Sequence, residues 1–162
     1  MATVYLSLGS NIDAENNLRL GVGELRQRFG AVSLSGTYRN AAVGFDGADF
    51  LNLVAAFESQ EEPLEIQRHI EEIHDKAGRQ RGGAKFSSRP LDIDLLMYGD
   101  SIIDEPPLRI PRPDVLEYVF VLGPLAELAP DLVHPETGRS MRDHWQECDT
   151  GRHPMTPIDV IL

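Results

Sequence analysis

The chain has 162 residues, of which 41% are hydrophobic and 25% charged, and its formal net charge is −11. This length and balance predict one globular domain, residues 1–162, and the negative charge argues against general nucleic-acid binding. No apolar run is long enough to cross a membrane, and the first residues do not resemble a signal peptide. Cys148 is the single cysteine. These features predict a monomeric, cytoplasmic protein without disulfides or membrane partners.

Hydrophobic periodicity predicts four strands and two helices before residue 100. Asp13 is expected to cap the first helix, and Pro63 to be the first residue of the second. The predicted elements, in chain order, are a strand at 3–8, a helix from Asp13 to Gly30, strands at 32–38 and 50–58, a helix from Pro63 to Gly78, and a strand at 91–99. The order β-α-β-β-α-β is typical of an α+β, ferredoxin-like sandwich. It predicts a four-stranded antiparallel sheet with both helices on one face.

The remaining residues, 101–162, are rich in proline. We expect a short hairpin formed by 101–104 and 108–111, then extra helices near 114–128 and 140–148. The tail after Thr150 is expected to be loosely held. Two connections, 39–49 and 78–90, are long for a compact domain and are therefore candidates for function.

Two aspartates lie one residue apart in an otherwise apolar strand. Leu91, Ile93 and Leu95 should point to one face, and Asp92 and Asp94 to the other, with Cα atoms roughly 6.6 Å apart. Like charges this close need a neutralising partner. Solvent or a salt bridge would serve, and so would a pair of Mg²⁺ ions, which favour carboxylate and phosphate oxygens.

The segment before the aspartates favours the metal interpretation. Between residues 76 and 91 there is no acidic residue, whereas five of the 15 basic residues of this acidic chain lie there: Lys76, Arg79, Arg81, Lys85 and Arg89. Arginines that grip phosphates, next to carboxylates that hold magnesium, suit polyphosphate chemistry. The alternative is a basic surface loop that balances the acidic remainder.

Other chemical motifs are not found. The segment "GRQRGGAKF" does not fit a Walker A loop, and Cys148 has no partner set for zinc. We interpret His134, His144 and His153 as ordinary surface or capping histidines.

Several stretches together resemble the 6-hydroxymethyl-7,8-dihydropterin pyrophosphokinase family of folate biosynthesis. The resemblance covers most of the chain and is most specific in the arginine-x-leucine-aspartate-x-aspartate block and in "PLAELAP". The stretches are "VYLSLGSNI", "YRNAAVGFDGADFLNLV", "GRQR", "SSRPLDIDLLMYG" and "IPRPDVLEYVFVLGPLAELAPDLVHPETG". The family has a ferredoxin-like fold. The resemblance implies transfer of pyrophosphate from ATP to the hydroxymethyl group of a reduced pterin, which leaves AMP.

The resemblance also implies roles for single residues. Asp92 and Asp94 would hold two Mg²⁺ ions, and the catalytic set would be Arg79, Arg89, Asp92 and Asp94. ATP would contact Arg79, Arg81, Arg89 and Ile93, with Arg112 as a further phosphate contact. The pterin would bind at Asn40, Val43, Phe50, Asn52 and Phe120. A flat heterocycle needs aromatic faces and a polar group at its edge, which Phe50 and Asn52 also offer on chemical grounds.

Several positions depart from the commonest family pattern. Phe86-Ser87-Ser88 replaces tryptophan-glycine-proline, Ala41-Ala42 replaces two prolines, and His74 stands where a glutamate is usual. Arg112-Pro113 replaces histidine-tyrosine, and an arginine expected near Tyr118 is missing. These changes bear on ATP affinity and loop closure more than on the type of reaction.

Two alternatives stay open at this stage. The first is a diverged paralogue that transfers pyrophosphate to another alcohol. The second is a non-catalytic module, because ferredoxin-like domains also serve as small-molecule sensors and fold alone does not fix function. Magnesium-dependent nucleotide binding would argue against the sensor, and AMP release with the pterin would argue against the paralogue.

Overall fold

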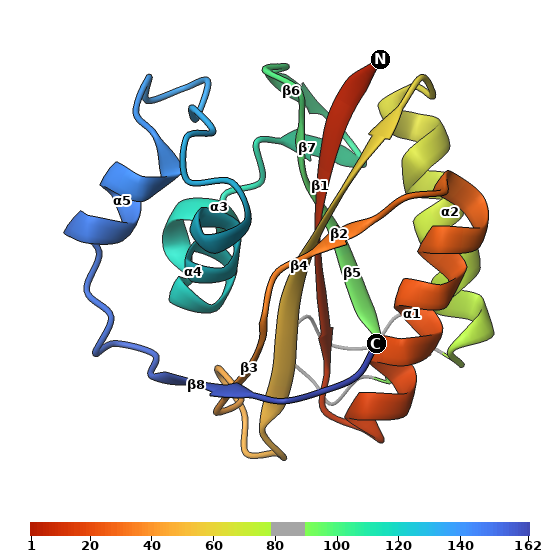
Figure 1. Cartoon of the computed structure of the whole chain (residues 1–162), viewed down its shortest axis with the longest axis vertical. Helices are drawn as coiled ribbons and strands as arrows, with labels where there is room; N and C mark the ends of the chain where they lie inside the picture. Colours follow the sequence, from red (N-terminus) through yellow and green to blue (C-terminus); the bar gives the residue numbers. More distant parts are fainter. Residues whose placement is uncertain (79–89) are drawn as a thin grey trace.

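The computed structural model describes residues 1–78 and 90–162. Its centre is an antiparallel sheet in which β1 (Ala2–Ser10) lies between β4 (Phe50–Ser59) and β5 (Asp92–Tyr98). β1 pairs with β4 along its whole length, from Ala2 opposite Ser59 to Ser10 opposite Leu51. Figure 1 shows this sheet between two layers of helices.

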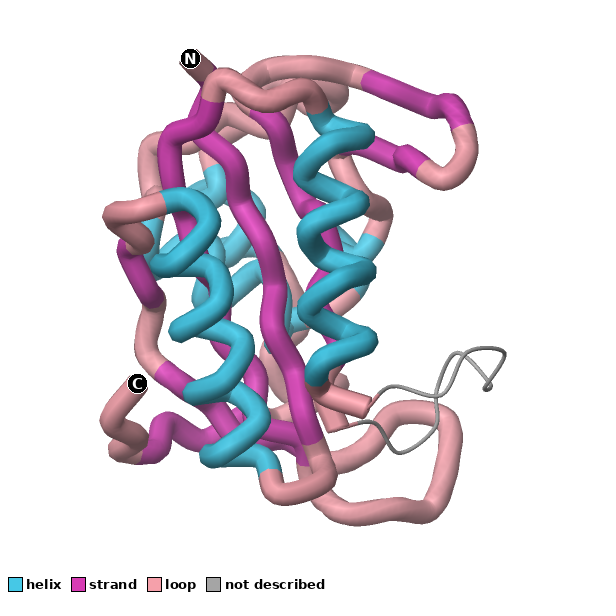
Figure 2. Tube along the Cα trace, turned by 90° about the vertical axis from the view of Figure 1, so that its right-hand side faces the viewer, coloured by secondary structure: helices cyan, strands magenta, loops and turns pink. Residues whose placement is uncertain are grey.

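Helices α1 (Ala14–Phe29) and α2 (Pro63–Lys76) cover one face of the sheet, side by side (Figure 2). Their apolar stripes meet the alternate strand residues that point the same way, which is what the periodicities of helix and strand require. The residues of this core include Leu18, Val22, Leu25, Ile66, Ile70 and Ile73 from the helices and Leu6, Leu8, Leu53, Ile93 and Leu95 from the strands.

The opposite face carries a second helical layer. It contains α3 (Asp114–Glu117), α4 (Val119–Leu128) and α5 (Met141–Glu147). A second core lies under α4, where Leu122 and Leu125 pack with Val54 and Leu96 of the sheet. A hairpin of β6 (Ile103–Glu105) and β7 (Leu108–Ile110) precedes these helices, as expected. Both faces of the sheet are therefore buried over part of their area.

The α+β class is confirmed, but the expectation of four strands is wrong, because the described residues already form a sheet of six. The strand expected at 32–38 is split into β2 (Ser33–Leu34) and β3 (Thr37–Asn40), which both pair with β4. The break coincides with contacts to residues that are distant in the sequence. The Ser35 hydroxyl accepts the N–H of Val54 at 2.9 Å, and Gly36 N–H is donated to Glu127 Oε2 on α4 at 2.7 Å.

The expectation of a loose tail is also wrong. β8 (Met155–Ile158) pairs with β3 and adds a strand at the edge of the sheet. The chain then reaches α1, where Arg19 Nε donates to the Ile161 carbonyl and an Arg26 Nη to the Leu162 carbonyl, both at 3.2 Å. These contacts join residues far apart in the sequence, so local periodicity could not reveal them.

The ends of the helices follow the sequence with two exceptions. Pro63 is at the start of α2, and Gly30 ends α1 with a φ of 83°, a conformation that favours glycine. Asp13 precedes α1 but has a φ of 45°, and its side chain accepts from the Asn16 amide at 3.0 Å instead of capping the backbone. The helix expected over 114–128 is interrupted at Tyr118, which is extended (φ −117°, ψ 125°). Within the described ranges no helix has the length and apolarity that a membrane crossing needs.

Candidate active site

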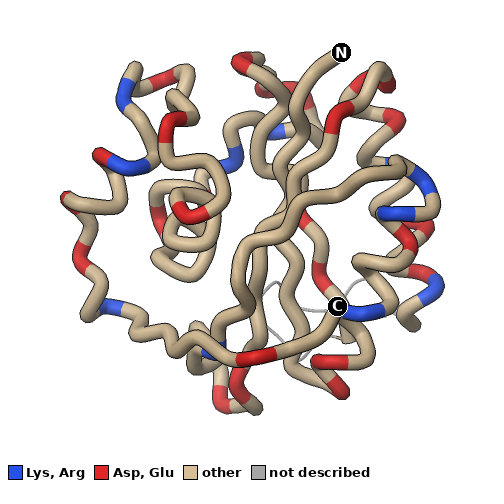
Figure 3. Tube along the Cα trace, viewed as in Figure 1, with Lys and Arg blue, Asp and Glu red and all other residues tan. Residues whose placement is uncertain are grey.

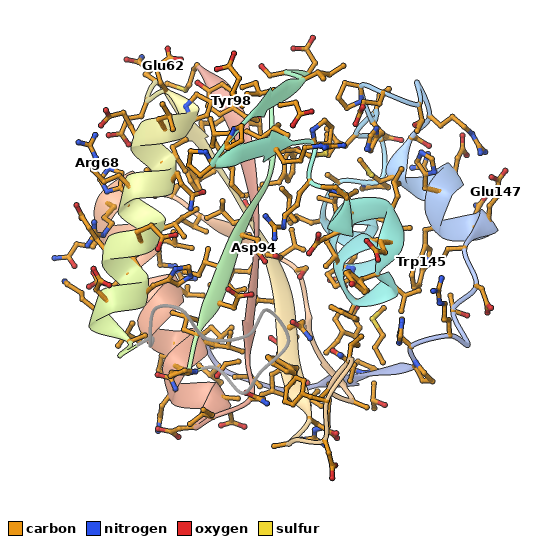
Figure 4. The ribbon with its side chains drawn as sticks, turned by 180° about the vertical axis from the view of Figure 1, so that it is seen from behind. Glu62, Arg68, Asp94, Tyr98, Trp145 and Glu147 are labelled. Atoms are coloured by element: carbon orange, nitrogen blue, oxygen red, sulfur yellow. The ribbon has the colours of Figure 1, made fainter. Side chains whose placement is uncertain are left out.

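The two aspartates lie on the face of β5 that points away from α1 and α2. Leu91, Ile93 and Leu95 alternate with them and are at most 5% exposed in the first core. Asp92 and Asp94 are half-buried on the opposite face, and Figure 4 shows Asp94 on the side of the sheet nearest α4. The alternation expected from the sequence is therefore confirmed.

Arg112 lies directly beside the aspartates. Its Nη2 is 3.5 Å from Asp94 Oδ1 and its Nε is 3.4 Å from Asp114 Oδ2. Its backbone N–H is donated to the Leu96 carbonyl at 2.9 Å, which fixes the residue against β5. Burial acts to lower the pKa of Arg112, but the carboxylates of Asp94 and Asp114 outweigh it and the pKa is raised. A permanent positive charge thus faces Asp94, at the place where a phosphate contact was expected.

Asn52 lies in the same row of the sheet as Asp92. Gly9 of β1 pairs with Asn52 on one side and with Asp92 on the other, so all three positions point to one face. A Cβ atom on Gly9 would lie only 2.6 Å from Asn52 Oδ1. Glycine therefore leaves room for the Asn52 amide to extend over β1. The other end of the amide donates from Nδ2 to Asn40 Oδ1.

The remaining residues expected at the pterin border the same face. Asn40 is 4% exposed, donates to the Ala41 carbonyl at 3.0 Å, and is the register partner of Phe50. Phe50 meets Phe45 edge to face, with ring centroids 6.2 Å apart. Val43 and Phe120 are half-buried against the second core. The structure thus brings Asn40, Phe50 and Asn52 together in the sheet, and Val43 and Phe120 border the core under the same face.

Phe120 belongs to an aromatic group that the sequence did not predict. Its ring stacks on Tyr118 with centroids 5.0 Å apart and an interplanar angle of 22°. His153 meets both rings, at 6.1 Å from Tyr118 and 6.2 Å from Phe120. His153 is therefore not an isolated surface histidine.

The basic segment is only partly within the described ranges. Arg79, Arg81, Lys85 and Arg89 lie outside the described residues, so their expected roles stay predictions. Lys76 is described, and its ammonium group pairs with Glu24 of α1. Lys76 therefore links the two helices that cover the first core, a role that sequence proximity to the basic loop did not suggest.

Sequence reasoning missed the part played by His74. This residue is 2% exposed on α2, and its Nε2 accepts the backbone N–H of Ile93 at 2.9 Å. Among the described strands β5 lies at the edge of the sheet, so this bond satisfies a group on its outer side, between the two aspartates. The Ile93 side chain is 2% exposed in the first core and its N–H is bonded to His74, so its expected contact with ATP stays a prediction. The sequence offered one signal for this role: His74 is a polar residue next to Ile73 on the buried side of α2.

The donor set fits magnesium better than a transition metal. Over residues 1–78 and 90–162, no group of three or more His, Cys, Asp or Glu side chains could hold a metal ion. Two carboxylates alone suit an ion that keeps water and substrate phosphates as its other ligands, which is the behaviour of Mg²⁺. The fold and this site therefore define a class: an α+β protein that carries two neighbouring carboxylates and an arginine on one face of its sheet.

The chain belongs to the 7,8-dihydro-6-hydroxymethylpterin-pyrophosphokinase (HPPK) family, whose model matches residues 5–130. Curated relatives agree with this over most of their length. The chain is 33% identical to the 2-amino-4-hydroxy-6-hydroxymethyldihydropteridine pyrophosphokinase of Aquifex aeolicus, over 83% of this chain and 85% of that protein. It is 37% identical to the enzyme of the same name from Porphyromonas gingivalis, over 84% of this chain and 96% of that protein.

Solved structures show the same fold. The crystal structure of Plasmodium falciparum HPPK-DHPS superposes with a TM-score of 0.73 at 13% identity. The match covers 90% of this chain and 44% of that longer chain, so it relates this protein to less than half of the Plasmodium polypeptide. At this identity the similarity concerns the fold alone.

Proposed function

We propose that this protein transfers the pyrophosphoryl group of ATP to the hydroxymethyl oxygen of 6-hydroxymethyl-7,8-dihydropterin. The new bond joins that oxygen to the β-phosphorus, the bond from the β-phosphorus to the bridging oxygen of the α-phosphate breaks, and AMP leaves. The hydroxyl proton passes to solvent. The family and the curated relatives support this reaction. The element order and the position of β1 between β4 and β5 support a ferredoxin-like framework.

The observation that carries the proposal is the row Asp92–Gly9–Asn52. In this row a carboxylate and an amide share one face, separated by a single strand that carries no side chain at Gly9. In this proposal the carboxylate serves the nucleotide and the amide serves the pterin. Neighbouring strands are about 4.8 Å apart, so the two substrates can approach each other above β1. Much of the catalysis in such a reaction comes from positioning the reactants.

Each group has a defined task in this proposal. Mg²⁺, when bound by Asp92 and Asp94, would neutralise the triphosphate and fix its geometry. Arg112, already beside Asp94, would add a contact to a phosphate oxygen. Arg79, Arg81 and Arg89 would bind the rest of the triphosphate. Asn52, held by Asn40, would bind the edge of the pterin, and Phe50 and Phe120 would contact its faces.

An assay of AMP release from ATP, Mg²⁺ and the reduced pterin tests the proposal. Wild-type protein is expected to release AMP. Asp92→Asn and Asp94→Asn are each expected to lower kcat by about 10²-fold or more, because each removes a charge that holds the metal. The circular dichroism spectrum should stay unchanged, since both side chains are half-buried and outside the hydrophobic cores.

Asp104→Asn is a matched control, because Asp104 is 72% exposed on β6, and its substitution removes an exposed pair with Arg109. Full activity in either active-site variant would contradict the metal assignment. AMP release with another alcohol, but none with this pterin, would favour a diverged paralogue.

A further inference from the structure

The C-terminal segment 149–162, here called the strap, lies beyond the residues that the family model matches. It leaves α5, passes α4, joins the sheet as β8 and ends beside α1 (Figure 1). Arg19 and Arg26 bind its last carbonyl groups. The strap is thus attached at several points along the edge of the sheet where Asn40 lies.

The register places the strap next to the pterin-side residues. Met155 is the partner of Asn40, and partners across an antiparallel pair point to the same face. Met155 also reaches α4, where its Cε and the Trp145 ring occupy the space that a side chain on Gly123 would need. The Trp145 Cη2 would be 2.9 Å from such a Cβ atom. Met155 therefore closes the edge between β3 and α4.

His153, two residues before Met155, lies beside Phe120, the aromatic residue expected to stack on the pterin. Its ring centroid is 6.2 Å from that of Phe120, in an edge-on arrangement of 71°, and 6.1 Å from that of Tyr118. The ring is half-buried, so part of its surface is open to a ligand. An imidazole offers a flat contact surface and a nitrogen that can donate or accept, which suits the edge of a nitrogen heterocycle.

We propose that the strap forms one wall of the pterin site and that His153 is a further substrate-binding residue for the flat heterocycle, in contact with Phe120. This inference rests on the proposed function, because it takes Phe120 as a pterin contact. His153 holds the Phe120 ring in place and covers the end of the site beyond Asn40. It has no part in binding the triphosphate.

His153→Ala is the test. The KM for the pterin is expected to rise about fivefold, the scale of one lost aromatic contact, with kcat and the KM for ATP within about twofold of wild type. His153→Phe keeps a ring and is expected to retain most of the pterin affinity. Thr156→Ala is the matched control, since Thr156 is exposed one residue from Met155 in the same strand.

Equilibrium binding of the pterin, measured by fluorescence quenching, separates this inference from the proposed reaction. If wild type binds the pterin but releases no AMP, the proposed function fails, and the affinity of His153→Ala still decides the inference. Unchanged pterin affinity in His153→Ala would overturn it. An equal loss in Thr156→Ala would overturn it too, because the strap would then act only through its stability.

Discussion

At the scale of single residues, the candidate site depends on one position that carries no side chain. Gly9 lies between Asn52 and Asp92, and its pairing with both fixes the distance between the expected binding sites of the two substrates. A Cβ atom at this position would lie only 2.6 Å from Asn52 Oδ1, so the Asn52 amide is the group with which it would collide.

The variant Gly9→Ala tests this interpretation of Gly9. The alanine methyl group is expected to displace the Asn52 side chain, which can rotate, so the fold should survive. The KM for the pterin should rise about tenfold or more, since a hydrogen-bonding group is moved away from its ligand. The KM for ATP should change much less. Gly23→Ala is a suitable control, because a Cβ at that position would meet no atom within 4 Å among the described residues, apart from its chain neighbours and its own helix backbone. Similar effects on both substrates would contradict the assignment.

His74 is the second residue whose effect can be measured directly. His74→Phe leaves the Ile93 N–H buried without its acceptor, and we expect a loss of about 1–3 kcal/mol in the free energy of unfolding. His74→Gln offers an amide oxygen in its place and should recover part of that loss. Glu71, a further partner at 3.5 Å, is 50% exposed and contributes little. Urea titrations of the three proteins give the comparison, and equal stability of the Phe variant and wild type would exclude the role.

At the scale of elements, the layer of α3, α4 and α5 packs on the second face of the sheet, which is the face that carries Asp92, Asp94 and Asn52. Glu127 of α4 accepts the N–H of Gly36 at 2.7 Å and the hydroxyl proton of Tyr38, which ties the helix to the break between β2 and β3. Burial and the contact with Glu127 raise the pKa of Tyr38 to about 12. The same helix carries Phe120, so its attachment positions an aromatic residue of the proposed pterin site.

The turn between α4 and α5 contains a histidine that should make stability depend on pH. His134 is 3% exposed, and its Nδ1 accepts the N–H of Glu136 at 3.2 Å, so it is a buried turn residue and the expectation of a surface position is wrong for it. Burial, aided by His144 and opposed by Glu136, lowers the pKa of His134 below its ordinary 6.5. The folded state therefore favours the neutral ring.

The sign of the effect follows from this shift. The contribution of His134 is complete above pH 6.5 and is lost as the pH falls through the lowered pKa of the folded state. We expect the free energy of unfolding to fall more steeply between pH 7.5 and pH 5 in wild type than in His134→Asn, because Asn keeps an acceptor but cannot be protonated there. Urea titrations at several pH values measure the difference. Parallel curves would show that His134 does not contribute.

At the scale of the whole molecule, the net charge of −11 opposes the binding of a polyphosphate. In Figure 3 the positions of acidic residues, in red, are spread along much of the chain. A site for ATP on such a protein requires concentrated positive charge, and in the described part Arg112 is the basic residue that pairs directly with the aspartate site. Mg²⁺ bound by the two aspartates would supply additional positive charge.

Thermal unfolding tests this requirement. With Mg²⁺·ATP at a hundred times its Kd, ligand linkage adds about 2.7 kcal/mol to the free energy of unfolding. For a domain of this size that raises Tm by about 5 to 11 °C. The shift should disappear with EDTA and in Asp92→Asn, whereas Asp104→Asn should keep it. A shift of the same size without Mg²⁺ would contradict binding through the aspartates.

The sequence alone determined those features that depend on neighbours along the chain. The alternation of Leu91, Ile93 and Leu95 with Asp92 and Asp94 fixed which face the carboxylates occupy, and the same alternation put Asn52 opposite Leu51 and Leu53. The helical stripes and the signals of Pro63 and Gly30 located α1 and α2. Family resemblance then supplied the reaction and the expected contacts.

Tertiary structure decided what depends on residues far apart in the sequence. The break between β2 and β3, the pairing of β8, the bond from Ile93 to His74 and the approach of Arg112 to Asp94 each join distant segments. Periodicity reports only which face a side chain points to, because it arises from the geometry of a single helix or strand. The packing of the elements decides which residues that side chain contacts.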